Sequence, residues 1–172
     1  CFTFQIYFDF SGYIDMAMGI ALLFNIRLPQ NFNSPYRANS IINFWQRWHI
    51  TLTNFLTNCI YFPWMKSLKK LNFLKTMIIT FFVFVIAGIW HGPSWGYVIF
   101  GSLHGLGLII NHSFRKLFKF KMNKYFSCFL TFNYINLTFI FFRSKSLENS
   151  INIIKGMSGF NGFSFSSLDP DK

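Results

Sequence analysis

One histidine, His91, lies in a short turn between two uncharged, largely apolar runs, Thr76 to Trp90 and Trp95 to Ile110. A helix as long as the first run rises about 22 Å, less than the hydrocarbon thickness of about 30 Å. If that run enters from the membrane edge, His91 lies below the opposite surface, inside protein or beside a cavity. An ionisable side chain at such depth is a candidate for function, and an imidazole can act as a base near neutral pH. The residues alone leave a second interpretation open, a helix-end histidine packed beside Trp90 and Trp95.

The composition is typical of a membrane protein. Apolar residues make up 52% of the chain and charged residues 12%, against about 25% charged residues in an average soluble domain. The net charge of +11 does not predict nucleic-acid binding, because the basic residues form short clusters between apolar stretches and no nucleic-acid-binding motif is present. Positively charged loops that face the cytoplasm and anionic lipid explain the charge.

Apolar stretches and helix signals predict an all-α fold, a polytopic transmembrane helical bundle with interfacial or re-entrant helices. A first helix is expected over Phe2–Ile26 and a loop over Arg27–Asn39, where prolines and asparagines gather. The runs beside His91 predict a helical hairpin whose two basic ends are cytoplasmic. A last span is expected over Tyr125–Phe142, followed by a more polar tail. Without a repeat or linker, residues 1–172 are expected to form one membrane domain, the C-terminal part of a longer protein.

A tryptophan-rich helix is expected between the loop and the hairpin, capped by Ser40 and ending near Trp64. Its apolar residues recur every three or four positions, and polar residues occupy much of the remainder, which indicates an interfacial or protein-enclosed helix. Arg47 on this helix is a candidate for binding a phosphate of coenzyme A from the cytoplasmic side. Snorkelling of Arg47 to the lipid headgroups is the alternative. The helix also carries His49, the second candidate for chemistry.

Other ionisable residues give weaker signals. Asp9 and Asp15 are six positions apart and lie on different helix faces, so a paired-carboxylate mechanism is not supported. Each is expected to form hydrogen bonds or an ion pair within the bundle. Among small residues, His104 is expected to serve helix packing, and His112 is expected at the membrane interface. No metal site is predicted, because the histidines lack cysteine or carboxylate partners at ligand spacing. The isolated cysteines predict no disulfide framework.

Five short blocks follow one another along the chain: Phe8–Met16, Pro29–Tyr36, Phe44–Leu52, Gly88–Gly92 and Phe141–Ser146. In this order they resemble the membrane-bound O-acyltransferases, and within them the bacterial alginate O-acetyltransferases and related cell-wall acetylation and D-alanylation proteins. The resemblance covers nearly the whole chain. It implies that His91 is the catalytic base, which takes the proton of a hydroxyl as that hydroxyl attacks an acyl carbonyl. It also implies a second catalytic histidine, His49, which would orient the thioester or polarise its carbonyl, with anchoring of its helix as the alternative.

The resemblance further implies an O-acetyltransferase that spans the bacterial inner membrane several times. Its donor would be a cytoplasmic thioester such as acetyl-CoA, with no cofactor bound permanently. Its acceptor would be a hydroxyl of alginate or another extracytoplasmic polysaccharide, reached with the help of a separate periplasmic acetyltransferase. Two alternatives stay open. One is a non-catalytic transporter or assembly subunit of a polysaccharide-modification system, and the other is an acyltransferase that modifies lipid.

Overall fold

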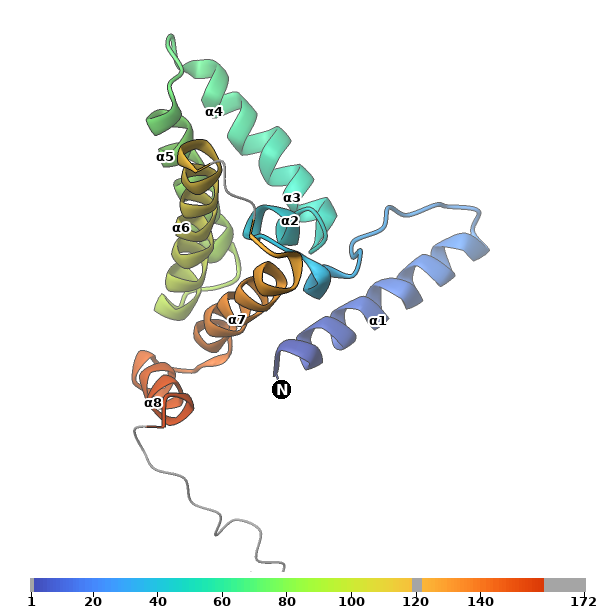
Figure 1. The fold of residues 1–172 in the computed structure, drawn as a ribbon. Coiled ribbons are helices and arrows are strands. Elements are labelled where there is room, and N and C mark those ends of the chain that lie inside the picture. Colours follow the sequence, from blue (N-terminus) through green and yellow to red (C-terminus); the bar gives the residue numbers. More distant parts are fainter. Residues whose placement is uncertain (1, 119–121, 160–172) are drawn as a thin grey trace, which may run out of the picture.

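A computed structural model describes residues 2–118 and 122–159, and every regular element within these ranges is a helix (Figure 1). The predicted all-α fold is therefore confirmed. Of the described helices, α1, α5 and α7 are long and apolar enough to cross a membrane. The elements follow one another as α1 (Phe2–Leu23), the 3₁₀ turn η1 (Pro35–Arg37), α2 (Ile41–Trp45), α3 (Ile50–Leu56), the π-helical turn η2 (Thr57–Tyr61), α4 (Phe62–Ser67), α5 (Phe73–Trp90), α6 (Trp95–Leu117), α7 (Lys124–Arg143) and α8 (Leu147–Met157).

The predicted hairpin is confirmed: α5 and α6 lie side by side and are joined by the turn at His91 (Figure 1). Glycines make this close packing possible. A Cβ atom on Gly88 would lie 2.3 Å from the carbonyl oxygen of Tyr97, and one on Gly101 would lie 2.3 Å from that of Phe84. No larger residue fits at either position without a backbone shift, so the glycines set the distance between the two helices.

The tryptophan-rich helix is interrupted, and the prediction of one continuous helix is wrong. Its start is confirmed, because the Ser40 hydroxyl accepts the Asn43 N–H at 3.1 Å and α2 follows. The helix ends at Trp45, and the chain turns sharply at His49, whose φ and ψ are 43° and 56°. The Asn31 carbonyl oxygen accepts the first N–H of α3 at 3.0 Å, so a distant loop stabilises this new helix start. Beyond the turn, α3, η2 and α4 continue as one rod (Figure 1).

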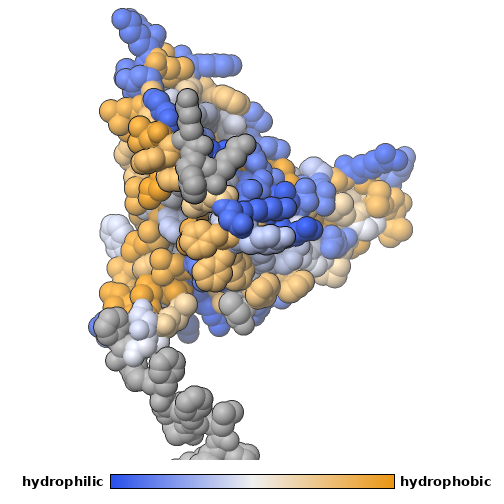
Figure 2. All heavy atoms as spheres, viewed as in Figure 1, coloured by the Kyte–Doolittle hydropathy of each residue, from blue (hydrophilic) through white to orange (hydrophobic). Residues whose placement is uncertain are grey.

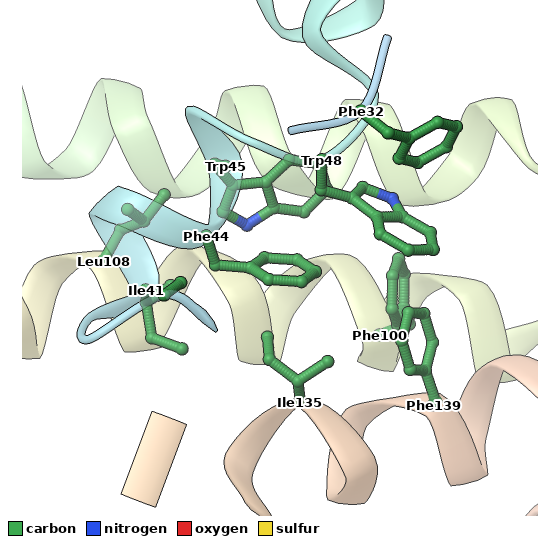
Figure 3. Close-up of a cluster of buried hydrophobic side chains, with 10 residues drawn as sticks. Phe32, Ile41, Phe44, Trp45, Trp48, Phe100, Leu108, Ile135 and Phe139 are labelled. Carbon is green, nitrogen blue, oxygen red and sulfur yellow. The ribbon is translucent and has the colours of Figure 1, made fainter. Parts of the chain in front are cut away.

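Aromatic side chains of α2 and of the turn that follows it fill the core where α6 and α7 meet. Figure 3 shows Phe44, Trp45 and Trp48 above side chains that rise from these two helices. The rings of Phe44 and Trp48 stack at a centroid distance of 5.6 Å, and Phe100 of α6 stacks on Phe139 of α7 at 5.9 Å. Burial of one large apolar side chain stabilises a fold by about 1.5–3 kcal/mol. This core therefore fixes the residues next to His49 against two long helices.

The last predicted helix is confirmed as α7, whose C-terminal end lies beside the turn between α5 and α6. A Cβ atom on Gly96, the second residue of α6, would lie 2.5 Å from the carbonyl oxygen of Phe141. The following helix, α8, was not predicted, because its sequence is polar. It begins at Ser146, whose hydroxyl accepts the Asn149 N–H at 3.2 Å.

The first predicted helix is confirmed as α1, which reaches the core through its N-terminal half and then extends away from it (Figure 1). Thr3 is its one buried residue, and Asp9 and Asp15 are exposed. Within the described residues neither carboxylate pairs with a cation, so the expected pairing of these acids in the bundle is not found there. Figure 2 shows hydrophobic side chains along α1 and over the hairpin, as expected of a helical membrane protein.

Candidate active site

His49 and His91 come from separate parts of the sequence and line the same cavity of about 280 Å³, here called the histidine cavity. His91 follows the last residue of α5, and His49 precedes the first residue of α3. The cavity is otherwise walled by apolar and aromatic side chains, and its polar groups are therefore concentrated in the two imidazoles. The remaining lining residues are Ile6, Phe10, Trp45, Trp48, Leu52, Trp90, Phe100, Phe139 and Phe142.

The imidazole of His49 is oriented by Asn31. The Asn31 Oδ1 atom accepts the Thr51 N–H at 3.2 Å and the Thr51 hydroxyl at 2.5 Å, which identifies this atom as the amide oxygen. His49 Nδ1 lies 3.2 Å from the same oxygen, so Nδ1 carries the hydrogen and donates it. In the neutral ring the lone pair is then on Nε2. The Phe10 ring packs edge-on against the imidazole at a centroid distance of 4.9 Å.

The imidazole of His91 is positioned by aromatic rings. Phe142 and Phe100 meet it edge-on at centroid distances of 5.0 and 6.0 Å, and Trp90 lies 5.0 Å away. Within the described part of the chain, the His91 ring nitrogens have no hydrogen-bond partner. Its nitrogens are therefore available to a substrate.

Both histidines of the cavity favour the neutral form. Burial lowers the pKa of His91 below its ordinary value. Burial also lowers the pKa of His49, and the nearby His91 lowers it further. Both residues lie outside the three helices that are long enough to span a membrane. A base must be unprotonated before it takes a proton, so the environment of each ring suits general-base chemistry near pH 7.

Arg47 faces a second, larger cavity of about 860 Å³, here called the basic cavity. Its guanidinium donates to Asn43 Oδ1 at 3.1 Å and to the carbonyl oxygen of Asn33 at 3.0 Å. No carboxylate lines this cavity within the described part of the chain. The sequence did not predict this grouping, because its members are scattered along the chain and no local motif joins them. The other basic side chains that line it are Arg37, Arg115 and Lys124.

One short segment, residues 43–49, borders both cavities. Side chains three and four positions apart lie on the same side of this segment, so its members divide between the two cavities. Three polar members face the basic cavity, and two tryptophans and a histidine face the histidine cavity. The first group is Asn43, Gln46 and Arg47, and the second is Trp45, Trp48 and His49.

The two other histidines lie elsewhere. His104 is completely buried, hydrogen-bonded to Trp45 and Thr138, and lines neither cavity, which agrees with its predicted packing role. His112 lines a separate cavity of about 180 Å³ that is formed with α3 and α5. In the ranges that the structure describes, no three side chains among His, Cys, Asp and Glu are arranged to hold a metal ion.

Comparison with known proteins gives consistent matches over this fold. Residues 2–150 match the family model described as membrane-bound O-acyltransferase family. The chain is 48% identical over 175 residues to a peptidoglycan O-acetyltransferase of Helicobacter pylori, covering 99% of this chain and 32% of that protein. It is 32% identical over 168 residues to a probable alginate O-acetylase of Pseudomonas aeruginosa, covering 98% of this chain and 32% of that protein. A teichoic acid D-alanyltransferase of Streptococcus thermophilus is 28% identical over 162 residues, covering 82% of this chain and 39% of that protein. The chain thus spans about a third of the length of these relatives.

Proposed function

This chain belongs to the membrane-bound O-acyltransferase family, and we propose that it carries the acid–base centre of an O-acetyltransferase. In this proposal an acetyl group moves from a cytoplasmic thioester toward hydroxyls of an extracytoplasmic polysaccharide. One observation carries the proposal. Two histidines from distant segments, each in surroundings that favour the neutral ring, meet at a single aromatic cavity.

His91 is the general base in this proposal. One of its ring nitrogens takes the proton of the acceptor hydroxyl while the hydroxyl oxygen attacks the thioester carbonyl carbon. The C–O bond forms, the C–S bond breaks, and the proton passes from the imidazolium to the leaving thiolate, which regenerates the base. The edge-on rings of Phe100 and Phe142 support this role, because they hold the imidazole and shield part of its surface from water.

We assign to His49 the orientation of the acceptor, through a hydrogen bond from a hydroxyl next to the one that His91 deprotonates. Because Asn31 accepts the Nδ1–H, the neutral ring has a lone pair on Nε2 and can accept a hydrogen bond there. Polarisation of the thioester carbonyl would require an N–H donor at this atom. The Asn31 contact therefore supports the hydroxyl-orienting role over the carbonyl-polarising role that the sequence suggested.

We assign the phosphates of acetyl-CoA to the basic cavity. Coenzyme A carries a diphosphate and a 3′-phosphate, and guanidinium groups bind phosphate through paired hydrogen bonds. Arg47 is joined there by two further arginines and a lysine, without a carboxylate among the described lining residues. The segment 43–49 borders both cavities. This supports a single donor molecule with its phosphates in the basic cavity and its thioester in the histidine cavity. The donor is consumed as a substrate, so no permanently bound cofactor is required.

A short acyl group fits the histidine cavity best. Its volume of about 280 Å³ lies just below the range of about 300–1,000 Å³ that is usual for small-molecule sites. Aromatic rings form most of its wall and leave little room for a long acyl chain. This supports acetyl as the transferred group.

For the acceptor we propose a polysaccharide of the bacterial cell envelope, modified from the inner membrane by a multi-pass protein with a periplasmic acetyltransferase as partner. The relatives carry peptidoglycan, alginate or teichoic acid in their names. Peptidoglycan is the acceptor to test first, because the peptidoglycan relative is 48% identical to this chain, against 32% and 28% for the alginate and teichoic acid relatives. Alginate is the second.

The full-length protein in membrane vesicles, supplied with acetyl-labelled coenzyme A and isolated peptidoglycan or alginate, tests the proposal. Wild type is expected to transfer label, and His91→Ala to lose transfer by about 10²- to 10⁴-fold at equal membrane level. His112→Ala, whose side chain lies outside both cavities, is the matched control. Wild-type transfer by His91→Ala would rule the proposal out. Translocation without any release of coenzyme A would support the transporter instead.

A further inference from the structure

A completely buried histidine, His104 of α6, takes no part in the proposed reaction, yet both of its ring nitrogens are hydrogen-bonded. The indole N–H of Trp45, on α2, donates to Nδ1 at 3.2 Å, and the hydroxyl oxygen of Thr138, on α7, lies 3.0 Å from Nε2. A buried polar group is costly unless it is hydrogen-bonded. One imidazole therefore connects three helices, and loss of either hydrogen bond would leave a buried polar group without a partner.

The directions of these hydrogen bonds follow from Thr138. Its hydroxyl donates to the carbonyl oxygen of Ile135 at 2.8 Å. A hydroxyl has one hydrogen, so toward His104 the same oxygen must accept. Nε2 consequently carries the hydrogen of the ring, and Nδ1 accepts from Trp45. Each group in the series Trp45, His104, Thr138 donates a hydrogen bond to the next, and the last donates to Ile135. This order allows a single neutral tautomer of His104.

His104 supports the histidine cavity without lining it. Trp45 and Phe100 both line the cavity, and their ring centroids lie 5.0 and 4.5 Å from the His104 imidazole. Phe139 follows Thr138 on α7 and lines the cavity as well. A displacement of the imidazole would therefore move side chains that shape one wall of the cavity.

We propose that His104 is a positioning residue, whose fixed tautomer ties α2, α6 and α7 together and holds the cavity wall formed by Trp45, Phe100 and Phe139. The effect on catalysis rests on the proposed function, whereas the tie itself does not. With both nitrogens bonded inside the protein, His104 exchanges no proton with a substrate.

Thr138→Val in the full-length enzyme tests the effect on catalysis, because it keeps the side-chain shape and leaves the His104 Nε2–H without an acceptor. We expect kcat for acetyl transfer to fall about 10- to 100-fold, the cost of a small displacement of reacting groups. The KM for acetyl-CoA should stay unchanged, and Thr138→Ser, which keeps the hydroxyl, should restore kcat. Thr131→Val, at another buried position of α7, is the matched control. A wild-type kcat in Thr138→Val would overturn the positioning role.

Nitrogen NMR of the full-length protein, labelled at histidine and held in lipid, tests the tautomer without acetyl transfer. The resonances that disappear in His104→Leu identify the residue. They should show a protonated Nε2 and a bare Nδ1, and they should shift in Thr138→Val but not in Thr131→Val. A protonated Nδ1 would overturn the inference. If the wild type transfers no acetyl group, the proposed function fails, and these resonances still decide whether the tie exists.

Discussion

His49 Nδ1 lies 3.2 Å from Asn31 Oδ1, across a separation of 18 residues in the sequence. The contact holds His49 in a left-handed backbone conformation, with φ of 43°, which costs about 1–3 kcal/mol in a residue other than glycine. The Asn31 carbonyl oxygen also accepts the Ile50 N–H, and its amide oxygen accepts from Thr51. These bonds offset the backbone strain and select the nitrogen that is left for a substrate.

Asn31→Asp should shift the pH dependence of acetyl transfer. A carboxylate beside Nδ1 stabilises the imidazolium of His49 and raises its pKa, by about one unit or more. Because the neutral ring is the active form, the acidic limb of the kcat/KM profile should move to higher pH. Gln30→Glu, which adds the same charge at the exposed neighbouring position, is the control. An unmoved acidic limb in Asn31→Asp would contradict the role that we assign to His49 in acetyl transfer.

The acidic limb of the wild-type pH profile should lie at a lower pH than a free histidine would give. Burial lowers the pKa of both His49 and His91, so each ring stays neutral to a lower pH than a free histidine with a pKa of about 6.5. The kcat/KM for acetyl transfer should therefore be constant above about pH 6.5 and fall only as the pH drops below that value. An acidic limb centred above it would contradict the assignment of a buried neutral base.

Arg115→Gln should weaken donor binding without slowing the chemical step. Removal of one cation from the basic cavity should raise the KM for acetyl-CoA about tenfold, the loss of one charge-assisted hydrogen bond, with kcat unchanged. Lys116→Gln is the matched control, because the Lys116 ammonium lies over the Phe73 ring at 4.1 Å and outside this cavity.

An acetyl-CoA analogue that lacks the 3′-phosphate refines the measurement. If Arg115 binds that phosphate, the variant and the wild type should have nearly the same KM for the analogue. An equal rise in the KM for acetyl-CoA in Arg115→Gln and in Lys116→Gln would instead indicate a general effect of surface charge. Such an effect would weaken strongly with added salt.

Gly101→Ala should destabilise the hairpin. The added Cβ would lie 2.3 Å from the carbonyl oxygen of Phe84, and overpacking of a tight contact costs about 1–3 kcal/mol. Thermal unfolding of the purified protein in detergent should therefore begin at a lower temperature than in wild type. Gly19→Ala, with no described atom within 4 Å of the new Cβ, is the control and should not lower it. Equal unfolding temperatures for both variants would contradict the close packing of α5 on α6.

The long helices could be predicted from the sequence because the signals that build them are local. The uncharged runs on either side of His91 contain their own helix-forming pattern. The glycines of α6 predict close helix packing beside His104. The side chain of His104 could be assigned to packing for the same reason. What the local pattern lacked was the identity of its partners, Trp45 and Thr138, which come from other helices.

The break at His49 could not be predicted, because its cause lies in another segment. The three- and four-residue spacing of apolar side chains continues across the break, since Trp48 packs in the same core as Phe44. The hydrogen bonds that stabilise the new helix start come from Asn31, in the preceding loop. The basic cavity is likewise a product of tertiary structure, as Arg37 and Arg115 are distant in sequence and meet only in the fold.

The segment 43–49 has a mechanical consequence for both cavities. Its residues contribute side chains to both walls, and the segment is held at one end by the Ser40 hydroxyl, which caps α2, and at the other by Asn31, which contacts His49. Because one short segment contributes to both walls, we expect a displacement of one wall to displace the other. We therefore expect binding in the basic cavity to change the alignment of the His49 ring, because the same short stretch of backbone carries side chains of both walls.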